Sequence, residues 1–271
     1  MQSNDFVVTV EVVPPAGPDA ESVLAALQAL EPLHVDGFNV ATNPVAKPRM
    51  SALALSVLIQ ERIEKPAVLH CTTRDHNRLS LQGLLWGAKA LGIDSVLITT
   101  GDFVALGDRA TTTTVRDVDV FDLIAMAQET GFSTGVVLDP FSSPDGLEGA
   151  VRRLERKVAS GAEYAITQPL YDPHNVEKIV ALTASIDVPI WMGILPLRTP
   201  RHAEFLHERV SGVVIPEQVR RRMEAADAPV AEGAAHAAEM LALARQNFAG
   251  ACLMPPFNHY EILEQILTHQ T

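Results

Sequence analysis

Short apolar segments alternate with longer amphipathic segments along the chain. Residues 7–13 carry valine on both sides of an extended pleat, a pattern typical of a strand that is buried on both faces. Seven further segments have the same apolar character. The eight expected strands are residues 7–13, 37–42, 67–73, 95–100, 135–138, 164–167, 189–195 and 251–254.

The segments between these strands have apolar residues at helical spacing and predict helices. The clearest of them spans residues 147–158, with Gly161 just past its end as a C-cap signal. The expected helices are residues 19–33, 51–64 with Ser51 in the N-cap region, a helix opening at Asn77, 120–130, 147–158, one starting near His174, 199–210, two stretches before Gly250, and 260–267. Residues 211–215 have strand propensity, but Pro216 ends them, so we assign them to a connection. Residues 103–119 form a long loop, of a length that is usually functional or disordered.

Strands that alternate with helices predict parallel βα units, which form an open doubly wound sheet or a closed barrel. Eight units in a chain of 271 residues favour the barrel. The G-x-G-x-x-G motif of a Rossmann fold is missing after the first strand. We therefore predict an α/β fold, a (β/α)8 TIM barrel. Because no composition break or linker interrupts the chain, we expect a single domain over residues 1–271.

The composition fits a protein with a sizeable core in a reducing compartment. Hydrophobic residues make up 47% of the chain, and the mean hydropathy is +0.13. The 33 acidic and 21 basic residues give a formal net charge of −12, which argues against a nucleic-acid-binding surface. Cys71 and Cys252 form no C-x-x-C pair, so we expect neither a disulfide framework nor a zinc site. No secretion signal or membrane-spanning run is apparent, and we expect a cytoplasmic protein.

Several of the expected strands end in a polar residue. These residues are Glu11, Asn43, His70 with Thr72, Asp102, Asp139 and Gln168. Each has a structural alternative, since Asn43 can cap a turn, His70 can be a satisfied core residue, and the aspartates can start loops. The active site of an eight-stranded barrel lies at the carboxyl ends of its strands. The recurrence of polar residues at that end therefore favours a functional site.

Glu11 lies among valines, where an ionised carboxylate costs several kcal/mol unless it is paired. Without a partner it keeps its proton and can act as an acid near neutral pH. The alternative is an edge strand with Glu11 in water.

Three kinds of chemistry can be compared with these residues. A metal-dependent hydrolase needs clustered His and carboxylate ligands, but the first strand offers only Glu11, so we expect no metal. Nucleophilic catalysis needs a nucleophile beside its base, whereas Cys71 and His70 are adjacent in a strand and point in opposite directions. The remaining chemistry is an acid or base that acts on a bound cofactor or heterocycle. Glu11 would donate the proton, and Gln168 and Asp102 would hold ring edges.

Six stretches of the chain, in this order, carry a resemblance to one family: VEVVPP, LHCTTRDHN, VLITTGD, ERKVASGAEYAITQP, GILPL and LMPPFNHYE. With these motifs the chain resembles the methylenetetrahydrofolate reductases over about residues 8–267. The pattern F-N-x-x-x-N-P followed by R-M-S, at residues 38–44 and 49–51, is most similar to the branch that is fused behind a homocysteine methyltransferase domain.

The resemblance implies a barrel that holds a flavin at its carboxyl-terminal face, FAD or alternatively FMN, with NAD(P)H as electron donor. Glu11 matches the family's general acid, which protonates the departing nitrogen of methylenetetrahydrofolate. Asp102 matches the carboxylate near flavin and pterin, and Gln168 matches the amide that holds the pterin or the nicotinamide. Cofactor contacts are implied for Asn43, His70, Thr72, Gly101, Asp102, Asp139, Arg156 and Lys157, the last two near the flavin phosphates. The implied partners are tetrahydrofolate derivatives, a methyltransferase and further copies of the chain.

The chain departs from the best-known bacterial members of this family at several positions near the flavin. These are residues 40–43 in place of T-Y-G-A, Thr100 and Asp139 in place of Arg and Tyr, Pro169 and Pro200 in place of aromatic residues, and Ala150 and Arg153 in place of polar flavin contacts. The departures leave a second hypothesis, a catalytically altered or flavin-free folate-binding partner of a methyltransferase system. Glu11 favours the enzyme, because a binding protein has no need of a proton donor.

Overall fold

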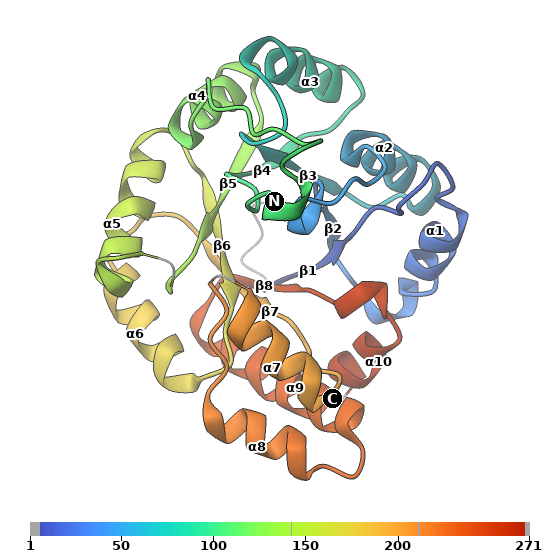
Figure 1. The fold of residues 1–271 in the computed structure, drawn as a ribbon, viewed down its shortest axis with the longest axis vertical. Coiled ribbons are helices and arrows are strands. Elements are labelled where there is room, and N and C mark those ends of the chain that lie inside the picture. Colours follow the sequence, from blue (N-terminus) through green and yellow to red (C-terminus); the bar gives the residue numbers. More distant parts are fainter. Residues whose placement is uncertain (1–5, 142, 211, 269–271) are drawn as a thin grey trace.

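The computed structural model describes residues 6–141, 143–210 and 212–268. Eight parallel strands close into a barrel in which every strand pairs with its neighbours in sequence and β8 pairs with β1 (Figure 1). The strands are β1 (Val7–Val12), β2 (Gly37–Val40), β3 (Ala67–Thr72), β4 (Ser95–Thr99), β5 (Ser133–Leu138), β6 (Tyr164–Pro169), β7 (Ile190–Ile194) and β8 (Gly250–Leu253). The predicted (β/α)8 barrel is confirmed.

Helices surround the barrel on its outside (Figure 1). They are α1 (Glu21–Gln28), α2 (Ala52–Ile63), α3 (Arg78–Ala90), α4 (Val120–Thr130), α5 (Gly146–Ala159), α6 (Pro173–Thr183), α7 (Pro200–Arg209), α8 (Glu217–Ala225), α9 (Pro229–Asn247) and α10 (Ile262–Thr268). Ser51 is an N-cap, as predicted, and accepts a hydrogen bond from the Ala54 N–H. Asn77, where a helix was predicted to open, is also an N-cap and accepts from the Ser80 N–H.

The sequence pattern overestimated the first helix. Residues 19–33 were expected to form one helix, but α1 ends at Gln28 and Glu31–Leu33 form a separate 3₁₀ turn. The apolar spacing continues through Leu30, whereas Pro32 lacks the N–H that a continuous helix needs and would clash with the preceding turn. Residues 212–216 contain no strand, so the assignment of this segment to a connection holds for its described residues.

Alternate side chains of each strand point into the barrel or out toward the helices. The interior group comprises Val7, Val68, Leu97, Tyr164, Ile166, Trp191 and Cys252. Cys71 belongs instead to the larger core between barrel and helices. By this alternation Glu11 and His70 point inward, and His70 and Cys71 point in opposite directions, as expected.

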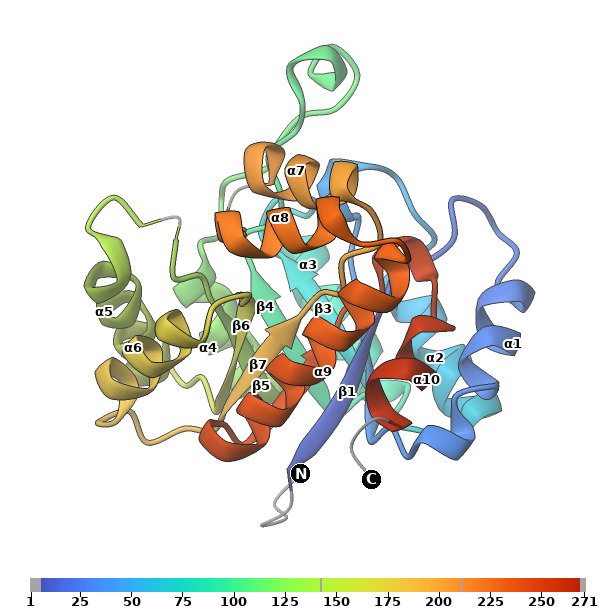
Figure 2. The ribbon, with the colours of Figure 1, turned by 90° about the horizontal axis from the view of Figure 1, so that it is seen from below.

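The segment between β7 and β8 contains three helices instead of one. Figure 2 shows α7 and α8 beyond the ends of the strands, on the side toward which the strands point. The helices α7 and α8 and the loops beside them share a separate apolar core. Its residues are Tyr171, Leu197, Ala203, Leu206, Val213, Ile215, Val219 and Met223. The mouth of the barrel is therefore partly covered from the β7 side.

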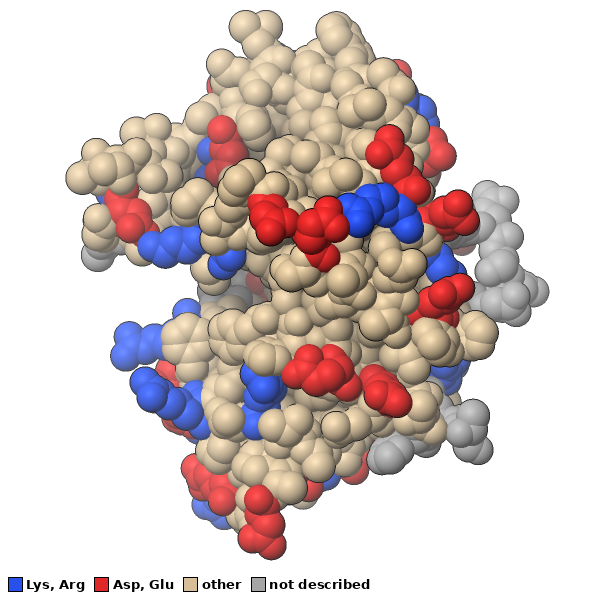
Figure 3. All heavy atoms as spheres, turned by 90° about the vertical axis from the view of Figure 1, so that its right-hand side faces the viewer, with Lys and Arg blue, Asp and Glu red and all other residues tan. Residues whose placement is uncertain are grey.

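The face of the barrel opposite the mouth carries the start of β1 and the end of α10. The loop at residues 103–119, in contrast, projects from the mouth (Figure 2). On the side that carries α1 and α10, acidic and basic side chains are interspersed and form no continuous basic patch (Figure 3).

Candidate active site

Glu11 lies on the inner face of β1, level with Asn39 of β2. Burial, and secondly the negative charge of Asp102, raise the pKa of Glu11 from 4.5 to about 7. No described residue donates a hydrogen bond to its carboxyl group. The carboxyl group can therefore hold a proton at neutral pH and give it up, which is what a general acid requires.

Two further groups lie within electrostatic range of Glu11. Cys252 is on β8, and Tyr260 follows it in the chain; burial is the main cause that holds the pKa of each side chain above its usual range. The Tyr260 hydroxyl is buried and has no hydrogen-bond partner among the described residues. Both groups are neutral at pH 7, so Asp102 is the charge that acts on Glu11.

Asp102 follows β4 on an exposed part of the loop, and its backbone and side chain are both bound. The Val45 N–H donates to Asp102 Oδ2 at 2.5 Å, and Arg74 Nη1 donates to the Asp102 carbonyl at 3.0 Å. Gly101 precedes it with φ +80°, a conformation that favours glycine. Asp102 lies near enough to Glu11 for its negative charge to raise the pKa of Glu11.

Asn43 and Thr72 lie in the same region of the mouth, where both bind Asp75. The Asn43 Nδ2 and the Thr72 hydroxyl donate to Asp75 Oδ2 at 3.1 and 3.2 Å. Asn43 Oδ1 accepts the N–H of Arg49. The side-chain amide of Asn43 is therefore engaged by the protein itself.

His70 is buried on the inner face of β3. Its Nε2 has no hydrogen-bond partner among the described residues, and burial lowers its pKa to about 4. The ring is neutral at pH 7. A buried ring nitrogen without a partner is a group that a bound ligand can satisfy.

Asp139 and Lys157 lie together on the β5 side of the barrel. Lys157 reaches from α5 and donates to the Val137 carbonyl at 2.6 Å. Burial and the charge of Arg153 lower the pKa of Lys157 to about 8, and Asp139 acts in the opposite direction. Gly212, with φ +82°, packs so closely on Asp139 that a Cβ there would lie 2.6 Å from Asp139 Oδ2.

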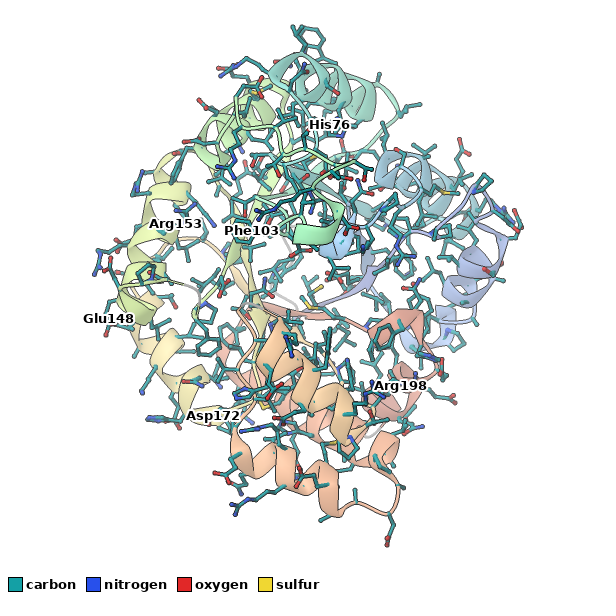
Figure 4. All side chains as sticks on the ribbon, in the orientation of Figure 1. His76, Phe103, Glu148, Arg153, Asp172 and Arg198 are labelled. Carbon is teal, nitrogen blue, oxygen red and sulfur yellow. The ribbon has the colours of Figure 1, made fainter. Side chains whose placement is uncertain are left out.

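Arg156 precedes Lys157 on α5. Its guanidinium group sits 4.5 Å from the ring centre of Phe121 on α4, in a cation–π contact. Figure 4 looks into the mouth and labels Arg153 on α5 together with Phe103, which is 87% exposed on the loop after Asp102.

Gln168 is half-buried at the end of β6. The register between β6 and β7 shifts between Ile166 and Pro169, so Gln168 lies in an irregular stretch of the strand. It makes no side-chain hydrogen bond to a described residue. Its amide is free to bind a ligand at the mouth.

Sequence reasoning missed Arg74, Asp75 and Asn258 as members of the site. All three lie in the motifs LHCTTRDHN and LMPPFNHYE, but nothing in those motifs identifies the distant residues that they bind. Arg74 and Asp75 form a buried ion pair, and Asn258 binds the backbone of Val13 beyond the end of β1.

The described part of the chain contains no cluster of three or more His, Cys, Asp or Glu side chains that could hold a metal ion. Among the same residues, no helix is long and apolar enough to cross a membrane.

The fold and the site place the chain among the (β/α)8 barrels with a candidate acid–base site at the carboxyl-terminal face. The model of the methylenetetrahydrofolate reductase family matches residues 1–252, so the chain belongs to that family.

Curated relatives agree with this family. The chain is 28% identical over 169 residues to methylenetetrahydrofolate reductase 1 of Schizosaccharomyces pombe, which covers 59% of this chain and 27% of the relative. It is 28% identical over 151 residues to a probable methylenetetrahydrofolate reductase (NADPH) of Caenorhabditis elegans, with 54% and 22% covered. The matches span about a quarter of the length of these relatives.

Solved structures show the same fold at low identity. A phosphonopyruvate hydrolase superposes with a TM-score of 0.56 and 14% identity, over 98% of this chain and 80% of that chain. A mutant tryptophan synthase α-subunit from Pyrococcus furiosus gives 0.57 and 11%, over 97% and 98%. These likenesses concern the barrel alone.

Proposed function

We propose that the chain interconverts methylenetetrahydrofolate and 5-methyltetrahydrofolate, with Glu11 as general acid. The observation that carries the proposal is the carboxyl group of Glu11, whose pKa lies at about 7 inside a barrel of this family. The methylene carbon of the substrate bridges two nitrogens. A proton from Glu11 on one nitrogen opens the ring and leaves an electrophilic carbon, and hydride transfer to that carbon gives the methyl group.

Other residues of the mouth support this assignment. The free amide of Gln168 offers donors and an acceptor to a pterin edge. Asp102 lies close enough to Glu11 to favour its protonated form, so the proton is present when the substrate arrives.

The residues present also fit a flavin, which would supply the hydride after its reduction by NAD(P)H. His70 Nε2 is buried and unpartnered, and flavin ring edges carry both donors and acceptors. Lys157 and the exposed Arg153 place positive charge on the β5 side, where phosphates would be favoured. We assign His70 and Asp102 to the ring system and Lys157 with Arg153 to the phosphates.

An absorbance spectrum of the purified chain, before and after titration with FAD and FMN, tests the cofactor. We expect a flavin spectrum with one flavin per chain. A colourless protein that takes up neither flavin would contradict the cofactor assignment. If it also binds tetrahydrofolate without turning it over, the folate-binding hypothesis replaces the enzyme.

The role of Glu11 is tested by comparing Glu11→Gln with Glu61→Gln, a matched change at an exposed position of α2. Stopped-flow absorbance follows reduction by NAD(P)H and then reoxidation by methylenetetrahydrofolate. We expect Glu11→Gln to leave reduction unchanged and to slow reoxidation by about 10²–10⁴-fold, the usual effect of losing a general acid. A normal reoxidation rate in Glu11→Gln would remove Glu11 from the mechanism.

A further inference from the structure

Arg74 and Asp75 follow β3 and form an ion pair at the mouth of the barrel. Arg74 Nε donates to Asp75 Oδ1 at 2.5 Å, and Nη2 donates to Oδ2 at 2.7 Å. The Arg74 side chain is 4% exposed and the Asp75 side chain 20%. Paired in this bidentate geometry, the two charges have well-defined positions.

The remaining hydrogen bonds of the pair reach two other loops. Arg74 donates to the carbonyl of Asn43 after β2 and to the carbonyl of Asp102 after β4, both at 3.0 Å. Asp75 accepts from the Asn43 amide and the Thr72 hydroxyl. The pair therefore joins the chain segments that follow three neighbouring strands.

The loop after β4 packs directly against Arg74. A Cβ at Gly101 would lie 3.2 Å from Arg74 Nη1 and 3.2 Å from Thr72 Cβ. Asp102, the next residue, is bound through its carbonyl by Arg74 and through its carboxylate by the Val45 N–H. The backbone of Asp102 is therefore held by the ion pair itself. Its carboxylate is held by the loop after β2, which the ion pair also binds.

The loop after β2 is held in a strained conformation. Asn43, Val45 and Ala46 have φ of 42°, 50° and 54°. Asparagine tolerates this left-handed region, whereas alanine does so poorly and a β-branched valine least of all. Such conformations persist where surrounding contacts determine them, and they concentrate at functional sites. Arg74 binds the backbone carbonyl of Asn43, and Asp75 binds its side-chain amide.

We propose that Arg74 and Asp75 are positioning residues that hold the loops after β2 and β4 together and thereby fix Asp102 beside Glu11. The role of the pair in the reaction rests on the function proposed for Glu11. Its role in holding the loops does not, and the two parts are tested separately.

The first test uses cleavage by trypsin, which reports the loops without reference to activity. Arg109 and Arg116 lie in the segment after Asp102 and are potential cleavage sites. Arg74→Lys keeps the charge but loses the fork that binds Asp75, Asn43 and Asp102 together. We expect trypsin to cleave Arg74→Lys severalfold faster than wild type after Arg109 and Arg116. Mass spectrometry identifies the fragments and measures their rate of formation.

Arg62→Lys is the matched control. Arg62 also binds a carboxylate in bidentate geometry, that of Glu21 at 2.6 and 2.9 Å, but on the exposed side of α2. Arg62→Lys should leave the rate of cleavage at Arg109 and Arg116 unchanged. If Arg74→Lys does not fold, Asp75→Asn tests the same contacts. Equal cleavage rates in wild type and in the folded variant overturn the proposal.

The second test uses the pH profile of the folate half-reaction. The titratable groups that face Glu11 are Asp102, Cys252 and Tyr260. Burial raises the pKa of the Cys252 thiol and of the Tyr260 hydroxyl and keeps both neutral, so the repulsion comes from Asp102. Loosening Asp102 weakens its repulsion of the Glu11 carboxylate, so Glu11 should lose its proton at lower pH. We expect the alkaline limb of the profile of Arg74→Lys to move to lower pH, with kcat reduced by about 10- to 100-fold and the profile of Arg62→Lys unchanged.

These outcomes separate the two proposals. A shift of the alkaline limb together with faster cleavage supports the positioning role. An unchanged profile overturns the link to Glu11. A wild-type protein without reductase activity refutes the proposed function, and the cleavage rates then still decide whether Arg74 and Asp75 hold the loops.

Discussion

Asn258 binds the backbone of Val13 with both ends of its side-chain amide. Oδ1 accepts the Val13 N–H at 3.3 Å, and Nδ2 donates to the Val13 carbonyl at 2.8 Å. Val13 lies just beyond the end of β1 and two residues after Glu11. The amide therefore holds the end of the strand that carries the candidate acid.

The reason for this contact lies in β8. The ladder between β8 and β1 ends where Leu253 pairs with Val10, and the chain then continues into Pro255 and Pro256. Proline has no N–H and cannot extend a ladder. The Asn258 amide takes the place of the missing peptide group.

We predict that Asn258→Ala lowers the free energy of unfolding by about 1–3 kcal/mol, because it leaves the Val13 N–H and carbonyl without their partner. Urea unfolding followed by circular dichroism measures the change. Asn247→Ala is the control, since Asn247 makes one exposed hydrogen bond to the Leu243 carbonyl. An equal loss of unfolding free energy in both variants would show that the contact with Val13 stabilises the fold no more than an exposed hydrogen bond does.

Glu11 should make the stability of the protein fall as pH rises. Its folded pKa of about 7 lies above the value of 4.5 expected when unfolded, so the folded state binds more protons between these values. The stability it contributes is complete below pH 4.5 and is lost as pH rises through 7. The raised pKa of Glu11 corresponds to a change of roughly 3 kcal/mol at most in the free energy of unfolding. We expect urea unfolding at pH 5 and pH 8 to show this loss in wild type and not in Glu11→Gln.

His70 acts in the opposite direction and must be separated from Glu11. Its folded pKa of about 4 lies below the unfolded value of 6.5, so its contribution is lost as pH falls through this range. Both proteins in the comparison retain His70. The difference between wild type and Glu11→Gln therefore isolates Glu11, and parallel pH dependences in the two proteins would refute the raised pKa.

Gln168→Ala should weaken folate binding more than reduction by NAD(P)H. Losing one hydrogen-bonding partner of a pterin costs about 1–3 kcal/mol, or roughly 5- to 150-fold in the dissociation constant. Isothermal titration with a tetrahydrofolate derivative measures the affinity, with Gln218→Ala on the exposed face of α8 as control. Unchanged folate affinity in Gln168→Ala would contradict the assignment of Gln168 to the substrate.

Val45→Gly should raise the stability of the protein. Val45 has φ 50° and is 60% exposed, so its side chain adds strain and little packing. Relief of about 1–2 kcal/mol of strain exceeds the entropic cost of glycine, about 0.5–1 kcal/mol. Thermal unfolding should show a gain, whereas Val214→Gly, at an exposed position outside the left-handed region, should show a loss. A loss in Val45→Gly would mean that its side chain contributes packing that outweighs the strain.

The barrel was predictable because its signal is local. The valines of β1 and the stripe of apolar residues on α5 reveal strand and helix by spacing alone. The burial of Glu11 was predictable for the same reason, since a carboxylate among valines is conspicuous. The first helix was overestimated because apolar spacing outweighed Pro32, a single residue whose missing N–H ends the helix.

The supporting contacts of the site were not predictable because they join distant parts of the chain. Arg74 binds carbonyls that lie 28 and 31 residues away, at Asp102 and Asn43. Asn258 binds Val13 across 245 residues. Backbone carbonyls carry no sequence signature, so no pattern in the chain identifies Arg74 or Asn258 as their partner.

The chain enters β1 and leaves α10 on the face of the barrel opposite the mouth (Figure 2). An attachment directly before β1 or directly after α10 would therefore start on the far side of the barrel from Glu11 and Asp102 and would leave the mouth open. Immobilised chain should thus retain access to large ligands such as folates and dinucleotides.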